Sequence, residues 1–256
     1  FDIDQHPTKM ATLVSAAAMF LRGDVKPAAT LIRAGLPLEK EIDLLRASGA
    51  WSLVDAAQLG VPRETVLMHR VAVTLSALAK PELNAPPARF AADTGELNWD
   101  LSTAGRGVVT INSHGTKGVI GYGAGKVFKL GNIVIEPGAT MQDGWSTITV
   151  NTMAEQPGGR VTHLVTATGY AENTGMGWKN AAKNTVGRDW GAAPSRVEGV
   201  SGRIAFARKT SLPSRAWALD RTGQRKTEVP LAAALEGVEL VIGPQWQTLW
   251  YEVELR

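Results

Sequence analysis

The sequence predicts a mainly β fold: an antiparallel β-sandwich of the immunoglobulin-like or jelly-roll type, preceded by a small helical segment. About a dozen runs of strand length follow one another over residues 94–256, and such short, regularly spaced runs are typical of a sandwich. The 27 Gly and 13 Pro residues indicate a body rich in turns. Residues 1–80 instead repeat apolar residues at helical spacing. We therefore expect a helical segment over 1–80, a Pro- and Ala-rich linker over 81–93 and the sandwich over 94–256.

The first helix is predicted by its two ends and by its apolar spacing. Thr8 can cap the start, and Gly23 can end the helix directly after Arg22. The apolar residues fall near i, i+3, i+4 and i+7, and they are Met10, Leu13, Val14, Ala17, Phe20 and Leu21. This helix therefore has one broad apolar face that requires a large partner. A short strand-like run follows at 28–34.

The remainder of the segment is expected to be mainly helical. We predict helices over 38–48, 51–59 and 63–75, with Pro62 at the first helical position of the third. His69 would then be a half-buried histidine on that helix.

The end of the chain reads as a pair of strands. The run over 237–255 predicts a closing hairpin with Pro244 in its turn. The last strand is rich in β-branched and aromatic residues, so we expect it to be paired inside a sheet. Trp250 and Tyr251 are neighbours in this strand and must point to opposite faces, so only one of them can belong to the core.

Composition argues against several classes of function. The chain has no cysteine, which excludes disulfides and thiolate metal sites, and its four histidines have no metal-binding spacing. The net charge is +3 with scattered basic residues, so nucleic-acid binding is not expected. The run Met10–Leu21 is shorter than the ~20 residues that a membrane span requires, and it lacks the basic region and cleavage site of a signal peptide.

No cofactor is expected, although a structural calcium ion held by backbone carbonyls is compatible with the sequence. The chain begins at Phe1, which suggests a processed product or a fragment.

Five phrases carry a resemblance to a known family, and they stand in a consistent order along the chain. They are "FDIDQHPTKMATLVSAAAMFLRGDV", "DTGELNWDLSTAGRGVVTINSHGTKGVIGY", "TATGYAENTGMGW", "WGAAPSRVEGVSGRI" and "TLWYEVEL". In this order they resemble the C-terminal region of a large bacterial glycoside hydrolase, in which a (β/α)8 barrel is followed by an all-β accessory domain. The first phrase is similar to the last strand-to-helix step of that barrel.

The resemblance implies a non-catalytic module that binds a polysaccharide or oligosaccharide, or that supports the catalytic barrel of the same parent enzyme. Nearly all of the barrel is missing here, and with it the strand ends that hold catalytic carboxylates in barrel enzymes. The parent protein would act outside the cell or in the periplasm. A helix cut off from its barrel would have to bury its apolar face elsewhere, so we also expect self-association.

A first alternative is that the chain is itself a glycoside hydrolase, which requires two suitably placed carboxylates. The candidates in polar or aromatic surroundings are Glu96, Glu136, Asp143, Glu172, Asp189 and Glu198. Glu172, Glu198 and Asp189 are the catalytic candidates that we consider most closely. Glu172 and Asn173 could instead bond backbone amides and so shape a loop. A second alternative is a purely structural protein-interaction domain.

The tryptophans of the β region suggest where a sugar could bind. An aromatic face packs well on the C–H face of a sugar ring. The predicted ligand-binding residues are three loop tryptophans beside glycines and three polar neighbours: Trp145, Trp178, Trp190, Asn173, Asn180 and Glu172. The competing interpretation is that these tryptophans pack against the missing barrel. No metal-binding residue is predicted.

Overall fold

The structure is a computed structural model that describes residues 7–48, 56–83, 87–183, 185–207, 213–234 and 236–256. Strands make up 43% and helices 15% of it, and the fold is the antiparallel β-sandwich preceded by a small helical segment that the sequence predicts. Contacts divide the chain into two compact units, one formed by Phe1–Asp24 with Arg106–Arg256 and the other by Val25–Gly105. This grouping differs from the ranges 1–80, 81–93 and 94–256 expected from the sequence in two ways: the first helix groups with the sandwich, and residues 94–105 group with the other unit.

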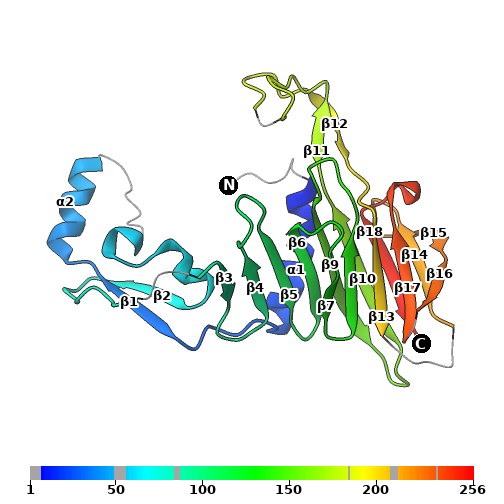
Figure 1. Ribbon diagram of the computed structural model, residues 1–256, viewed down its shortest axis with the longest axis horizontal. Helices are drawn as coiled ribbons and strands as arrows, with labels where there is room; N and C mark the ends of the chain where they lie inside the picture. The colour runs from blue at the N-terminus through cyan, green and yellow to red at the C-terminus, as the bar shows by residue number, and fades with distance from the viewer. Residues whose placement is uncertain (1–6, 49–55, 84–86, 184, 208–212, 235) are drawn as a thin grey trace. The chain divides into compact units, whose positions relative to one another are not determined.

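The first unit contains a sandwich of two sheets of antiparallel strands (Figure 1), and a separate two-stranded sheet that is described below. In the first sheet the order is β15-β14-β18-β10-β9-β6-β5, with β5 Val108–Asn112, β6 Thr116–Tyr122, β9 Trp145–Glu155, β10 Val161–Thr168, β14 Arg215–Leu219, β15 Arg225–Val229 and β18 Trp250–Leu255. In the second sheet the order is β16-β17-β13-β8-β7, with β7 Phe128–Leu130, β8 Ile133–Pro137, β13 Gly202–Ala207, β16 Leu231–Ala234 and β17 Gly237–Ile242.

The core lies between these two sheets and follows the alternation of side chains along each strand. On β9, Ile148 and Val150 are buried in this core. Ile204 and Phe206 come from β13, and Tyr251 from β18. The remaining buried apolar side chains of both sheets join the same cluster. This one core therefore fixes the strands whose ends carry the cavities described below.

The two last strands correct one prediction and confirm two. The expected hairpin over 237–255 is wrong: β17 pairs with β13 and β16, whereas β18 pairs with β10 and β14 in the other sheet. The short 3₁₀ helix Pro244–Trp246 therefore connects the two sheets. The last strand is paired on both sides, as predicted. Tyr251 is buried in the core and Trp250 remains partly exposed on the opposite face.

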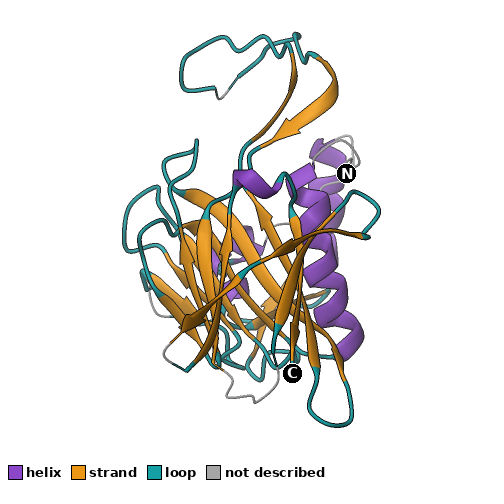
Figure 2. Cartoon of the chain, turned by 90° about the vertical axis from the view of Figure 1, so that its right-hand side faces the viewer, coloured by secondary structure: helices purple, strands orange, loops and turns teal. Residues whose placement is uncertain are grey.

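Helix α1 (Pro7–Arg22) lies along the outer face of the first sheet (Figure 2), which confirms that the first helix forms. Its predicted start and packing face are wrong: the helix begins before Thr8, and it buries Ala11, Ser15 and Met19 in place of the predicted apolar face. Ser15 is buried, and its hydroxyl is 2.8 Å from the Thr149 hydroxyl and accepts a 3.1 Å bond from Asn151 Nδ2. At its end, Arg22 donates to the Thr152 carbonyl at 2.8 Å and to the Thr116 hydroxyl at 2.7 Å. Polar bonds thus attach α1 to β6 and β9, since this face of the sheet is rich in threonine.

The unit Val25–Gly105 has a small core of its own, made by Ala34, Leu36, Leu59 and Val61. Its elements are β1 Leu31–Gly35, α2 Leu38–Ser48, the 3₁₀ helices Ala56–Leu59 and Arg63–Leu67, β2 Arg70–Thr74, β3 Arg89–Ala91 and β4 Leu97–Asp100. Strands β1 and β2 are parallel, and β3 and β4 form an antiparallel hairpin.

The predicted helix over 63–75 is wrong. Only one 3₁₀ turn forms, with Pro62 preceding it as its N-cap, and the β-branched residues after it form β2, which pairs with β1. His69 is half-buried, as predicted, but lies in the turn before β2 with its Nδ1 2.8 Å from Asp93 Oδ1. Of the helix predicted over 51–59, residues 51–55 lie outside the described residues, and the remainder is a 3₁₀ turn.

Candidate functional site

A hairpin projects from the sandwich and carries the loop that the sequence singles out (Figure 1). Its strands are β11 (Ala171–Thr174) and β12 (Ala192–Val197), which pair with an irregularity between Asn173 and Thr174. We call β11, β12 and the connecting loop the arm. Both Trp178 and Trp190 belong to it.

Glu172 organises the lower part of the arm through its two carboxylate oxygens. Oε2 accepts bonds from the Tyr170 hydroxyl, from Trp178 Nε1 at 3.0 Å and from Lys183 Nζ at 2.9 Å. Oε1 accepts a 3.0 Å bond from Arg196. The carboxylate thereby joins both strands of the arm to the loop between them.

These bonds determine the charge of the site. They hold the pKa of Glu172 at about 2, chiefly through the hydrogen bond from Tyr170 and then those from Lys183 and Trp178. Burial, followed by the bond to Glu172, raises the pKa of Tyr170, and the bond to Glu172 raises the pKa of Lys183. Glu172 is therefore an anion at neutral pH and has no proton to donate as a general acid.

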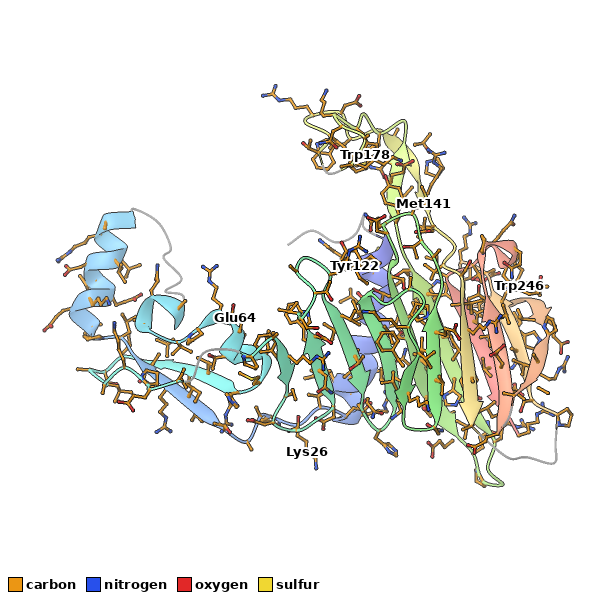
Figure 3. The ribbon with its side chains drawn as sticks, in the orientation of Figure 1. Lys26, Glu64, Tyr122, Met141, Trp178 and Trp246 are labelled. Atoms are coloured by element: carbon orange, nitrogen blue, oxygen red, sulfur yellow. The ribbon has the colours of Figure 1, made fainter. Side chains whose placement is uncertain are left out.

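A cavity of about 510 Å³ opens at the base of the arm, and we call it the aromatic cavity. It is lined by Tyr122, Met141, Gln142, Asp143, Trp145, Tyr170, Ala181, Ala182 and Lys183. Tyr122 and Trp145 are direct cross-strand partners at the ends of β6 and β9. Figure 3 shows Tyr122 and Met141 on the side of the sandwich that faces the arm, and Trp178 on the arm itself.

Cations lie against two of the three rings in this cavity. The Arg106 guanidinium is 5.3 Å from the centre of the Tyr122 ring, and Lys183 Nζ is 5.0 Å from the centre of the Tyr170 ring. Arg106 also donates to the Asp143 carbonyl at 3.2 Å. These contacts fix both tyrosine rings and leave polar groups beside them.

Glu198 holds two walls of the aromatic cavity together. Its Oε1 accepts a 2.7 Å bond from the backbone N–H of Met141, and its Oε2 accepts a 3.1 Å bond from that of Tyr170. A Cβ at Gly169 would lie only 2.7 Å from Oε2, so a larger residue there would displace the carboxylate. The carboxylate thus has a positioning role for the turn before β9 and for the start of β11.

The structure places the six predicted ligand-binding residues in three positions. Trp145 lines the aromatic cavity. Glu172 and Trp178 stand behind Tyr170, with the Tyr170 and Trp178 ring centres 6.4 Å apart.

The other three lie farther along the arm. Asn173 Nδ2 donates to the Trp190 carbonyl at 3.0 Å, and the Trp190 side chain is 61% exposed. Asn180 is an exposed loop residue whose carbonyl accepts a bond from the Lys183 N–H. The sequence suggests that the Glu172 and Asn173 side chains could bond backbone amides. The bonds described here instead join the Glu172 carboxylate to side chains and the Asn173 amide to a backbone carbonyl.

The candidate carboxylates do not share one environment. Both oxygens of Glu172 and of Glu198 are committed to the bonds above, and Asp189 is an exposed arm residue. Asp143 lines the aromatic cavity, whereas Glu136 is exposed on β8 of the second sheet. Glu96 lies in the unit Val25–Gly105, just before β4. Within the described residues, no three or more His, Cys, Asp and Glu side chains are placed to hold a metal ion.

Sequence reasoning missed Tyr122, Tyr170 and Lys183 as cavity residues. Both tyrosines stand directly after a glycine at a strand end, which is the same signal that drew attention to the loop tryptophans. Their meeting with Trp145 depends on strand register and on the fold of the arm, and neither can be read from one sequence.

Comparison with known proteins gives no relative: no protein-family model, curated protein or solved structure matches this chain. Among the helices of the described residues, none is long and apolar enough to cross a membrane.

Proposed function

We propose that this chain is a non-catalytic carbohydrate-binding module that holds a glycan in the aromatic cavity. The observation that carries the proposal is the convergence of Tyr122, Trp145 and Tyr170 on one cavity of about 510 Å³. That volume falls in the range of about 300–1,000 Å³ typical of ligand sites. Aromatic faces pack on sugar C–H faces, and Gln142, Asp143 and Lys183 supply groups that bond hydroxyls.

The proposal includes the context that the sequence suggests. The phrase "TATGYAENTGMGW" contributes Tyr170 to the cavity and contains the carboxylate and the indole that brace it. We infer a parent glycoside hydrolase that acts on a polysaccharide outside the cell or in the periplasm, with this chain retaining the glycan near the catalytic barrel.

Affinity electrophoresis against a panel of plant and microbial polysaccharides tests the proposal. We expect at least one polysaccharide to retard the chain. Trp145→Ala should weaken the affinity for that polysaccharide at least about fivefold, since stacking on an aromatic ring contributes roughly 1–3 kcal/mol in comparable ring-on-ring contacts. Trp250→Ala is the matched control, because Trp250 is a partly exposed strand tryptophan that does not line the cavity.

Two results would contradict the proposal: no retardation by any polysaccharide, or equal retardation of the Trp145→Ala variant and the wild-type chain. Circular dichroism of both variants shows that the comparison is made between folded proteins.

A second candidate function is support of the catalytic barrel through α1. Phe20 is 85% and Leu21 is 82% exposed, and Met10 and Leu13 are also exposed, although the helix is held by the sheet on its other side. Apolar side chains gathered on one helix are typical of a surface that another domain covers. The occupant that we propose is the barrel of the same parent enzyme.

Without that barrel, these side chains should drive self-association of the isolated chain. We expect light scattering to give a mass above that of the monomer, and the double variant Phe20→Ser, Leu21→Ser to restore the monomer. A clean monomer for the wild-type chain would contradict this second candidate.

The alternative of a catalytic chain has less support. Glu172 stays ionised and fully bonded, and Glu198 accepts two backbone bonds, so neither carboxylate is available as the proton donor of a glycosidase. A purely structural interaction domain would use the same exposed side chains of α1 and would leave the aromatic cavity without a role.

A further inference from the structure

A second cavity, also of about 510 Å³, lies at the opposite ends of β6, β9 and β10, and we call it the basic cavity. It is lined by His114, Gly115, Lys117, Asn132, Ile133, Val150, Thr152, Glu155, Gln156, Gly159, Arg160, Val161, His163 and Leu255. None of these residues lines the aromatic cavity.

The basic cavity has an apolar floor. Ile133, Val150 and Leu255 are buried members of the sandwich core, and Val161 is half-buried beside them. They come from both sheets, so the cavity is an opening into the space between the sheets. The lower part of the cavity therefore offers apolar side chains to a ligand.

His163 forms a rigid wall between this floor and the rim. Its ring is 4% exposed and stacks on Phe206, with the ring centres 5.4 Å apart. Its Nδ1 is 3.3 Å from the Thr152 hydroxyl. The orientation of the imidazole is thus fixed by both the core and the strand β9.

Positive charge prevails at the rim. Lys117 Nζ donates to Asn112 Oδ1 at 2.8 Å and to the Ser113 carbonyl, and its third proton remains for another acceptor. Burial lowers the pKa of Lys117, with Asp24 acting in the opposite direction. The Arg160 side chain makes no hydrogen bond or ion pair within the part of the chain that the structure describes. Among the lining residues, Glu155 is the acidic one.

We propose that the basic cavity binds a small organic carboxylate, with its charged group between Lys117 and Arg160 and its apolar body on the floor of the cavity. The planar guanidinium of arginine matches the two oxygens of a carboxylate, and a partly desolvated ammonium strengthens the attraction. Apolar side chains together with a few charged or polar groups are typical of ligand sites. A sugar acid and an aliphatic acid share this chemistry.

Isothermal titration calorimetry of the full chain with two acids and their neutral counterparts tests the proposal. The probes are hexanoate against 1-hexanol and glucuronate against glucose, so that each pair differs in the carboxylate. We expect at least one acid to bind at least tenfold more tightly than its neutral counterpart. Binding of hexanoate assigns the site to aliphatic acids, and binding of glucuronate assigns it to sugar acids. The proposal is overturned if neither acid binds more tightly than its counterpart.

Charge-removing variants locate the binding. Arg160→Gln should weaken binding of the acid at least tenfold, whereas Arg221→Gln, which removes an exposed arginine in the turn after β14, should leave it unchanged. Lys117→Met should have an effect in the same direction, provided that circular dichroism shows a folded chain. Wild-type affinity in the folded Arg160→Gln variant would overturn the assignment, and this test is independent of glycan binding at the aromatic cavity.

Discussion

Strands β6, β9 and β10 have a cavity at each end, and the two cavities differ in chemistry although one core supports both. At one end, three aromatic rings surround a cavity whose walls are held by the carboxylates of Glu172 and Glu198. At the other, Lys117 and Arg160 stand above an apolar floor. Strands β6 and β9 contribute side chains to both cavities, whereas β10 contributes side chains to the basic cavity.

This comparison shows how chemistry is divided between strands and connections. Tyr122, Trp145 and Lys117 lie on strands β6 and β9. Tyr170, Lys183 and Arg160 lie in the connections beside them. Loops can vary without disturbing a packed core, which is why binding residues are often found there. The two ends should therefore respond separately to mutation, whereas the core between them should not.

The largest effect is expected from the shared core. Phe206 is 1% exposed and also stacks on His163, so Phe206→Ala should lower the free energy of unfolding by about 3–5 kcal/mol. Urea denaturation measures the change. Val241→Ala, an exposed position on the neighbouring strand β17, should stay within about 0.5 kcal/mol of the wild-type chain. Equal free energies of unfolding for Phe206→Ala and Val241→Ala would show that this core does not stabilise the strands that form the two cavities.

A smaller, local effect is expected at the aromatic end from acid. The pKa of Glu172 is lowered from 4.5 to about 2 in the folded chain, so its contribution to stability is present above pH 4.5 and is lost as the pH falls toward 2. The indole N–H resonance of Trp178, which donates to this carboxylate, should shift over that range and stay constant above it.

Glu172→Gln should remove this pH dependence, because the amide does not titrate. Glu136→Gln, which neutralises an exposed carboxylate on β8, should leave it as in the wild-type chain. If the Trp178 resonance moved near pH 4.5 and above, Glu172 would not have the bonds described here.

The fold class and the first helix could be predicted from sequence because alternation and helical spacing are local signals. The terminal hairpin could not: the run around Pro244 has the turn residues of a hairpin, yet it connects two stacked sheets. Nor could β2, since residues 63–75 also fit a helix and only pairing with β1 decides the outcome. Prediction of the site has the same limit. The glycine beside Trp145 drew attention to this residue, but that Tyr122 lies next to it depends on the register between β6 and β9, which the sequence does not give.

The most direct test of the central claim, that the aromatic end binds a glycan on its own, assays one variant of each end against both ligands. We predict that Trp145→Ala loses retardation by the polysaccharide that retards the wild-type chain, whereas Arg160→Gln keeps it. For the small carboxylate we predict that Trp145→Ala keeps the wild-type affinity and Arg160→Gln loses it. Undiminished retardation of a folded Trp145→Ala variant would contradict the account.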